Sequence, residues 1–280
     1  MTIETNAEWR PGQHIYLRFL TQGVHALTAH PFTICSLATA RPTGRNEMVF
    51  YVRTRSGLTG RLGRLADKNP GVSVPVLLDG PYGGVSSRWF DGFDHTVVIG
   101  GGAGAGFALA LARYFLLAQR QLTPSRQGKM TLVVSSRDHG LRLWYLEALA
   151  AAIAEGKEDS ADSIQNYGLA VRIHETGGPV ETSSAHGSEN DDRPKNKEEA
   201  VSQSHDLEGV QTGVFSGRPD LFALGQDVLA AAEGASIGFV VCGPGSMVHD
   251  VGQIAASAQA SVARGKSGPS EVWFHKESFS

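Results

Sequence analysis

The sequence has few cysteines, little net charge and no long apolar run. Two of its 280 residues are cysteine, Cys35 and Cys242, so a disulfide framework is excluded and a reducing compartment is favoured. The formal net charge of −3 argues against a nucleic-acid partner. No stretch reaches the roughly 18 apolar residues of a membrane helix, and the nearest one, residues 106–119, is interrupted by Arg113. With no apolar signal segment at the start, we expect a soluble, cytoplasmic chain, and we predict no metal site.

The pattern of apolar residues divides the chain at about residue 90. Residues 1–90 indicate short strands between turns, with one helix over 58–67, as in a small antiparallel barrel. From His95 onward, apolar strands at 96–100, 131–136, 169–175, 237–242 and 271–275 mostly alternate with helical segments. We therefore predict an α/β protein, a partial antiparallel β-barrel followed by a doubly wound parallel sheet over residues 91–280. A polar stretch at about 176–212 has too few large apolar residues to pack, and we expect a disordered insertion there.

The segment His30-Pro31-Phe32-Thr33 is a candidate ligand contact in the first half. Pro31 fixes the backbone and removes one donor, so that a ring, a hydroxyl and the Ile34 amide can face a ligand edge. The alternative is a proline turn that leads into a buried strand.

Two glycine-rich loops are candidate pyrophosphate sites. Residues 100–106 (GGGAGAG) leave a strand and open a helix, where free amides and the helix dipole favour an anion. The second loop, residues 56–60 (SGLTG), adds the Thr59 hydroxyl. The alternatives are a turn whose glycines serve packing only, and an ordinary helix cap by Ser56.

The end of the second predicted parallel strand bears on the choice of coenzyme. It ends Ser135-Ser136-Arg137, with no acid for ribose hydroxyls until Asp138. A cation beside two hydroxyls favours the 2′-phosphate of NADPH, whereas the alternative for Arg137 is a solvated charge.

Two further segments are candidates for a site. One separates the two predicted halves, and the other follows an apolar strand. Residues 79–84 (DGPYGG) are typical of a type II turn. Cys242 ends an apolar strand before Gly243-Pro244, so it is predicted to face the crevice at the carboxyl ends of the strands. The alternative is a buried, inert thiol.

Six motifs in one order then suggest a family. HPFT, SGLTGRL, DGPYG, GG-x-G, GRPDL and CGP follow one another here as in the cytosolic dehydrogenase portion of fungal ferric-chelate reductases. The chain resembles that portion over nearly its whole length except the polar insertion. The resemblance places it in the ferredoxin reductase-like superfamily, together with the NADPH oxidases.

The resemblance implies two cofactors, FAD and NADPH, and assigns residues to each. The residues implied for FAD are His30, Pro31, Phe32 and Thr33 at the flavin, and Gly57, Leu58 and Thr59 near its pyrophosphate. Those implied for NADPH are Gly101, Gly102 and Gly104 at its pyrophosphate, and Arg137 and Arg218 at its adenosine end. Gly80, Pro81, Cys242, Gly243 and Pro244 would flank the nicotinamide, and Phe279 would stack on the flavin.

The implied reaction is hydride transfer from NADPH to FAD, followed by single-electron delivery to haem and then to Fe(III) or Cu(II). The family's haem domain lies in the membrane and would be the partner of this module at the cytosolic face of the plasma membrane. That domain and the first barrel strands are expected to be missing from residues 1–280. Two alternatives are the dehydrogenase lobe of a superoxide-producing NADPH oxidase, and a non-catalytic protein that keeps the fold without holding flavin.

Overall fold

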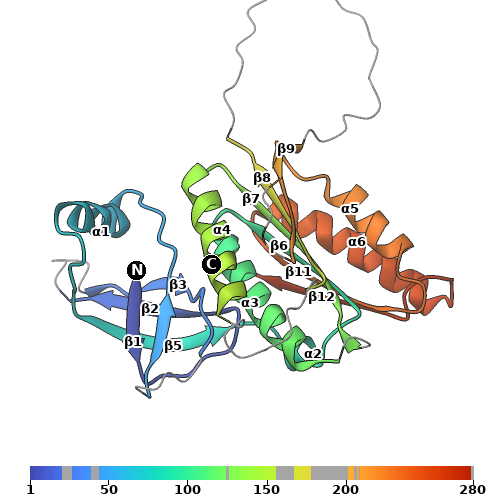
Figure 1. Cartoon of the computed structure of the whole chain (residues 1–280), viewed down its shortest axis with the longest axis horizontal. Helices are drawn as coiled ribbons and strands as arrows, with labels where there is room; N and C mark the ends of the chain where they lie inside the picture. Colours follow the sequence, from blue (N-terminus) through green and yellow to red (C-terminus); the bar gives the residue numbers. More distant parts are fainter. Residues whose placement is uncertain are drawn as a thin grey trace, which may run out of the picture.

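The computed structural model describes residues 1–20, 27–38, 44–123, 126–155, 167–177, 201–204, 207 and 209–278. Strands dominate its N-terminal half, and strands alternate with helices in the remainder (Figure 1). The N-terminal elements are β1 (Thr2–Thr5), β2 (Gln13–Phe19), β3 (His30–Thr33), β4 (Asn46–Val49), α1 (Gly57–Lys68) and β5 (Val76–Gly83). The later strands are β6 (His95–Gly101), β7 (Lys129–Ser136), β8 (Leu169–Glu175), β9 (Val201–Ser204), β10 (Gln211–Ser216), β11 (Ser236–Cys242) and β12 (Glu271–Glu277). The later helices are α2 (Ser87–Phe90), α3 (Ala105–Gln121), α4 (His139–Ala154), α5 (Leu221–Ala230) and α6 (Gly245–Ala263), with a 3₁₀ turn at Gly102–Gly104.

The N-terminal strands form two small antiparallel sheets, one in the order β3-β2-β5 and one that pairs β1 with β4. Their apolar side chains share one core, in which Leu17 and Phe19 of β2 meet Met48 of β4 and Leu58 of α1. Because alternate residues of β2 are buried, this strand covers the core with one face only. The antiparallel part of the predicted fold is confirmed.

The second half is a sheet in the order β12-β11-β6-β7-β8-β10-β9, in which only β9 runs antiparallel among these strands. The chain moves outward from β6 through β7, β8 and β10, and then returns to the other side of β6 with β11 and β12. Helices α3 and α4 cover one face, and α5 and α6 cover the other (Figure 1). The doubly wound sheet is therefore confirmed, with its reversal of strand order between β6 and β11.

Part of the polar stretch predicted at 176–212 forms strands in the structure. Strand β9 and the start of β10 lie inside that range, and the two strands are paired. The sequence hides this pairing because β9 has four residues, three of them polar. Residues 178–200 lie outside the described part of the chain.

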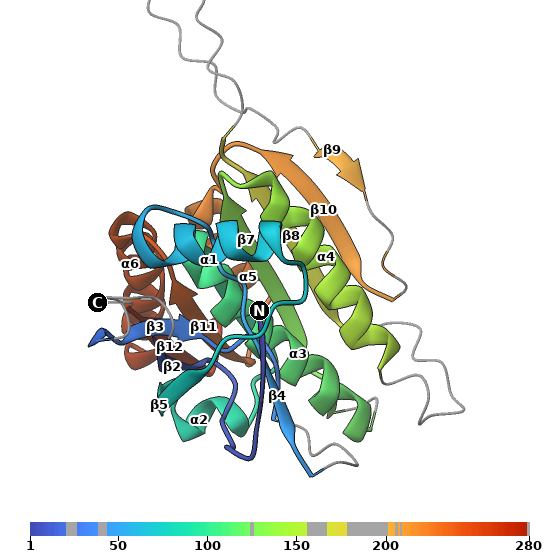
Figure 2. The same ribbon diagram turned by 90° about the vertical axis from the view of Figure 1, so that its left-hand side faces the viewer.

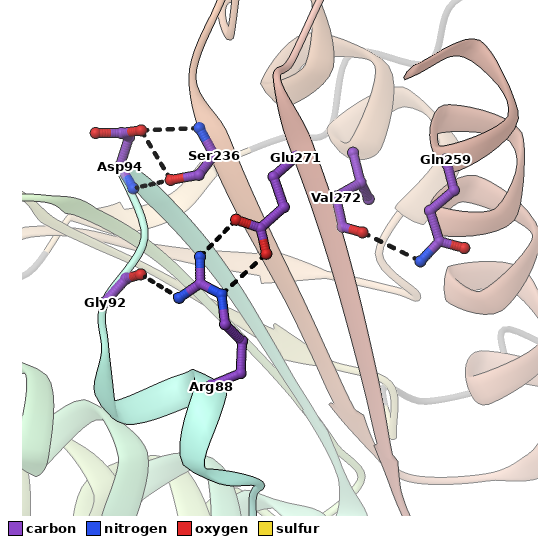
Figure 3. Close-up of polar contacts among 7 residues, drawn as sticks. All are labelled: Arg88, Gly92, Asp94, Ser236, Gln259, Glu271 and Val272. Carbon is purple, nitrogen blue, oxygen red and sulfur yellow. Dashed lines mark hydrogen bonds and ion pairs between the residues drawn. The ribbon is translucent and has the colours of Figure 1, made fainter. Parts of the chain in front are cut away.

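Helix α2, which follows the N-terminal strands along the chain, is held against the start of β12 at the edge of the parallel sheet (Figure 3). Arg88 of α2 donates two hydrogen bonds to the Glu271 carboxylate, at 2.9 and 2.6 Å. Beside them, the rings of Phe93 and Trp273 stack at 5.6 Å. Seen from the side of the N-terminal half, β2, β3 and β5 lie in front of the parallel sheet, so the first half covers its α3 side (Figure 2).

Among the described residues, no helix combines the length and the apolar character needed to cross a bilayer.

Candidate functional site

A cavity of about 300 Å³ lies between the N-terminal half and the carboxyl ends of β6 and β7. Both halves contribute side chains to it, which no local sequence motif reveals. The described lining residues are His14, Pro31, Phe32, Thr33, Cys35, Tyr51, Val52, Arg53, Arg55, Thr59, Gly102, Ala103, Gly106, Ser136, Asp138 and Leu141.

The segment predicted to face a ligand forms strand β3, and three of its four residues line the cavity. Pro31 is tolerated because β3 is the edge of its sheet, where a missing donor leaves no ladder bond unmade. Phe32 is only half-buried and meets Phe19 and Phe50 edge-on at 6.1 and 6.3 Å, which fixes its ring. His30 lies at the other end of β3, where its Nε2 is 2.8 Å from the Thr28 hydroxyl.

One detail of that prediction is wrong. The Ile34 amide was expected to face a ligand, but it donates to the Gln13 carbonyl at 3.1 Å. The turn alternative is wrong too, since these residues are extended and pair with β2.

The predicted second pyrophosphate loop is the N-terminus of α1. Ser56 occupies the capping position, yet its side chain makes no capping hydrogen bond, so the ordinary-cap alternative is not observed. Gly57 has φ +71° and Leu58 is buried, whereas Thr59 lines the cavity and its Oγ1 accepts from the Arg55 amide at 3.1 Å. The first amides of α1 therefore lack a side-chain cap, beside the exposed arginine of the preceding loop.

A polar group between the halves was missed by sequence reasoning. The Tyr51 hydroxyl donates to the Asp138 carboxylate at 3.2 Å, and Arg53 Nε lies 3.6 Å from the same oxygen. Burial, and next the Asp138 charge, raise the pKa of Tyr51 to about 12. The other Asp138 oxygen caps α4 by accepting the Gly140 amide at 3.0 Å. Tyr51 and Arg53 lie more than 80 positions before Asp138 in the sequence, so no spacing pattern predicts their contacts with it.

The glycines of the loop after β6 serve different purposes. A Cβ at Gly104 would lie 1.9 Å from the Cys242 carbonyl oxygen, and one at Gly101 would lie 2.7 Å from Pro244 Cδ. These two glycines allow the ends of β6 and β11 to pack closely. Gly102, in contrast, has φ +58° with open space around its Cβ position and lines the cavity. The packing alternative thus accounts for two of the three glycines.

Cys242 is fully buried against this loop, and burial, together with the nearby Glu277 charge, raises the pKa of its thiol to about 12. It is absent from the described cavity lining, so the structure agrees with the buried-thiol alternative for its present surroundings. Gly243 packs on Gly101, and Pro244 begins α6 with an exposed ring.

Arg137 and Arg218 are exposed at the carboxyl edge of the sheet, one after β7 and the other after β10. Between them, Glu175 ends β8, and its carboxylate is held by His139 Nδ1 at 3.1 Å and Arg142 Nη1 at 3.2 Å. Neither exposed arginine pairs with a carboxylate of the described residues.

Gly80 and Pro81 are in strand β5 rather than in a turn, and this prediction is wrong. The β2–β5 register shifts between His14 and Tyr16, which accommodates glycine and proline within a paired strand. Neither residue is among the described lining of the cavity. Phe279 lies outside the described residues.

The cavity has the features that FAD and NADPH require of a protein. The uncapped amides of α1 with Arg53 and Arg55 suit one pyrophosphate, and the open Gly102 turn before α3 suits another. His14 Nδ1 is buried at the wall of the cavity without a hydrogen-bond partner among described residues, so it can serve a polar ligand atom.

Comparison with known families agrees with this geometry. The ferric reductase NAD-binding domain matches residues 93–256, which is more than half of the chain, and an FAD-binding domain matches residues 1–86. The chain belongs to the ferric reductase family. It is an FAD- and NAD(P)H-dependent oxidoreductase module of that family.

Two curated relatives are fungal. The probable cell surface ferric reductase kap2 of Aspergillus oryzae is 33% identical over 110 residues, 37% of this chain and 14% of that protein. The ferric reductase transmembrane component 6 of Saccharomyces cerevisiae is 32% identical over 106 residues, 35% of this chain and 13% of that protein. The matched parts thus span far less than two thirds of either relative.

Solved structures share the fold at low identity. The Amycolatopsis cytochrome P450 reductase GcoB superposes with a TM-score of 0.56 at 16% identity, covering 99% of this chain and 64% of that one. The FAD/NAD-binding domain of a Vibrio cholerae nitric oxide dioxygenase gives 0.56 at 16%, with 98% and 86% covered. A ferredoxin-NADP⁺ reductase variant from Plasmodium falciparum gives 0.52 at 12%, with 99% and 88% covered.

Proposed function

We propose that this module takes hydride from NADPH on its parallel-sheet half, delivers it to FAD in its N-terminal half, and passes electrons singly to a haem-containing membrane part. Fe(III) or Cu(II) would be the final acceptor, so that one NADPH reduces two metal ions and one proton is released. FAD, when bound, supplies the conversion between two-electron and one-electron chemistry. The module would then work at the cytosolic face of the plasma membrane.

One observation carries the proposal. A single cavity is lined both by Pro31, Phe32 and Thr33 of β3 and by Gly102 of the dinucleotide loop. Two ring systems held by these two sides would meet in the same space, and orientation is the main contribution that such a protein makes to hydride transfer.

The chain's own residues would divide the work of binding. Phe32, fixed by its two edge-on neighbours, would position the flavin ring beside the Thr33 hydroxyl. The α1 N-terminus with Arg53 and Arg55 would hold the FAD pyrophosphate, and the Gly102 turn that of NADPH. Arg137 and Arg218, both exposed at the sheet edge, would hold the adenosine end.

The roles of the remaining predicted residues are proposals of the same kind. Cys242, Gly243 and Pro244 would flank the nicotinamide after some movement of the buried Cys242 strand end, and Phe279 would stack on the flavin. His30, Gly80 and Pro81 would support β3 and β5 rather than touch a ring, since none of them is among the described lining of the cavity.

Purification of the chain tests the proposal directly. We expect flavin absorbance to be retained or restored by titration, and we expect NADPH-dependent reduction of ferricyanide, which needs no membrane partner. Absence of both FAD binding at micromolar concentration and NADPH consumption would overturn it.

A further inference from the structure

Helix α1 and the loop before it carry positive charge that the rest of the chain does not share. The whole chain has a formal net charge of −3. Between positions 53 and 68, however, five basic residues accompany a single acid, Asp67. The five basic residues are Arg53, Arg55, Arg61, Arg64 and Lys68.

Three of these charges share one side of the helix. Arg61, Arg64 and Lys68 are spaced by three and four residues, so their side chains project from the same face, and all three are exposed. We call them the basic face of α1. Leu58, three residues before Arg61, is buried in the core of the N-terminal half, so the start of the helix packs on that core.

The basic face forms no ion pair with a described residue. Three arginines elsewhere in the described chain, Arg88, Arg113 and Arg142, each lie within 3.2 Å of a glutamate oxygen, whereas the exposed Arg137 and Arg218 stand singly after different strands. Unpaired exposed basic residues are common singly, but three on one helical face raise the local electrostatic potential. Such a face favours an anionic partner.

The position of the helix leaves this face accessible. Figure 1 shows α1 at the outer end of the N-terminal half, away from the parallel sheet. Thr59, near the helix start, lines the cavity, but none of the basic-face residues does. The face therefore stays free when the cavity holds its cofactors.

We propose that the basic face of α1 docks on the surface of an anionic phospholipid bilayer. This inference rests on the proposed function, which sets the module beside a membrane. The charges are complementary, and long arginine and lysine side chains can reach headgroups while their stems cover apolar surface. Half-buried Leu65 lies within the face, and Val72, 43% exposed, follows the helix, so apolar contact can add to the charge.

We expect the basic face of α1 to bind an anionic bilayer with moderate affinity. Each basic residue close to an anionic bilayer strengthens binding about fivefold, so three give on the order of a hundredfold. That is too weak for a permanent anchor of an isolated chain. It is enough to fix the orientation of a module already held near the membrane, where its effective concentration is high.

Vesicle cosedimentation of the purified full chain tests the proposal. We expect binding to phosphatidylcholine vesicles that contain phosphatidylserine, weak binding to phosphatidylcholine alone, and release at high salt. The triple variant Arg61→Gln, Arg64→Gln and Lys68→Gln should lose about a hundredfold in affinity, because glutamine keeps helix propensity and removes the charge. The matched control removes three exposed charges elsewhere, as Arg126→Gln, Arg264→Gln and Lys266→Gln, and should bind like the parent chain.

Several outcomes would overturn the inference. These are equal binding to neutral vesicles, equal loss in both triple variants, or retention by heparin without any binding to anionic vesicles. Failure of the proposed function would look different, since FAD titration and ferricyanide reduction are measured without vesicles. The α1 triple variant should retain both activities, and a loss of FAD affinity in it would reassign these charges to the cofactor.

Discussion

The two helix-initiating loops that face the cavity are built in opposite ways. In the loop before α3, Gly101 and Gly104 are buried and would place a Cβ against Pro244 and against the Cys242 carbonyl at the end of β11, while Gly102 has open space. The loop before α1 is exposed and has two arginines in place of such packing. Each can hold a pyrophosphate, the first mainly through placement of backbone amides and the second mainly through charge. Mutations should therefore act on the first through packing and on the second through electrostatics.

The largest effect is expected at Gly104. In Gly104→Ala the new Cβ would lie 1.9 Å from the Cys242 carbonyl oxygen, a backbone atom that cannot rotate away. Because β6 or β11 must shift, we expect a loss of about 3 kcal/mol in unfolding free energy, and weaker NADPH binding. Urea unfolding and NADPH titration measure the two effects.

Gly102→Ala is the control for that substitution. Its Cβ would meet nothing within 4 Å, so only the positive φ of +58° is unfavourable, at about 1–2 kcal/mol. Equal destabilisation by the two alanines would show that close packing is not what distinguishes this loop.

The second largest effect is expected in the loop before α1, which carries two arginines. Arg53→Gln with Arg55→Gln should weaken FAD binding about tenfold per arginine, since each removes a charge-assisted contact. Stability should change little, because Arg53 is 46% exposed and its pairing with Asp138, at 3.6 Å, is loose. FAD titration at low and high salt measures this, with Arg264→Gln as the control. A salt-independent affinity in the parent chain would contradict the role of charge.

Many of the strands could be predicted from the sequence, and others could not. The strands predicted at 131–136 and 237–242 correspond to β7 and β11, because long apolar runs bounded by turns determine buried strands. The four-residue strands β1, β4 and β9 lack such a signal. Residues 79–84 have turn composition, yet pairing with β2 makes most of them a strand, as tertiary context overrides local preference.

The residues of the candidate site also fall into those that the sequence indicates and those that it does not. Pro31, Phe32, Thr33, Thr59 and Gly102, all within motifs that the sequence singles out, line the cavity. Tyr51, Arg53 and Asp138 were missed, because their contacts exist only once the two halves pack together. Sequence patterns thus find residues that act through local backbone geometry, and they miss those that act across the interface.

A third prediction concerns a charge at the carboxyl edge of the parallel sheet. Arg137→Ala should lower the ratio of kcat/KM for NADPH over NADH about tenfold, because an exposed cation without a described partner is available for the 2′-phosphate. Arg126→Ala, before the amino end of β7, is the control. Steady-state kinetics with both coenzymes measure the ratio, and an unchanged ratio would assign NADPH preference to another group.

The smallest effect is expected where a charged contact holds α2 against β12. Arg88 binds both Glu271 oxygens and the Gly92 carbonyl (Figure 3). Its guanidinium also lies 4.0 Å from the Phe93 ring centroid. The side chains are nevertheless 30% and 43% exposed, so solvent screens the pair. Arg88→Gln should therefore cost at most about 1 kcal/mol at neutral pH.

The contribution of the Arg88–Glu271 contact to folding stability depends on pH. The Arg88 hydrogen bonds lower the pKa of Glu271 below its ordinary 4.5. A carboxylate with a depressed pKa stabilises the folded state above the pKa of the unfolded chain, and this stabilisation disappears as pH falls through the lower, folded value. The difference in thermal stability between the parent chain and Arg88→Gln should accordingly be full at pH 7 and shrink in acid below 4.5. A difference that stays constant into acid would mean that Arg88 holds α2 in place by packing on Phe93, and that this contact acts through packing, as the loop before α3 does, rather than through charge.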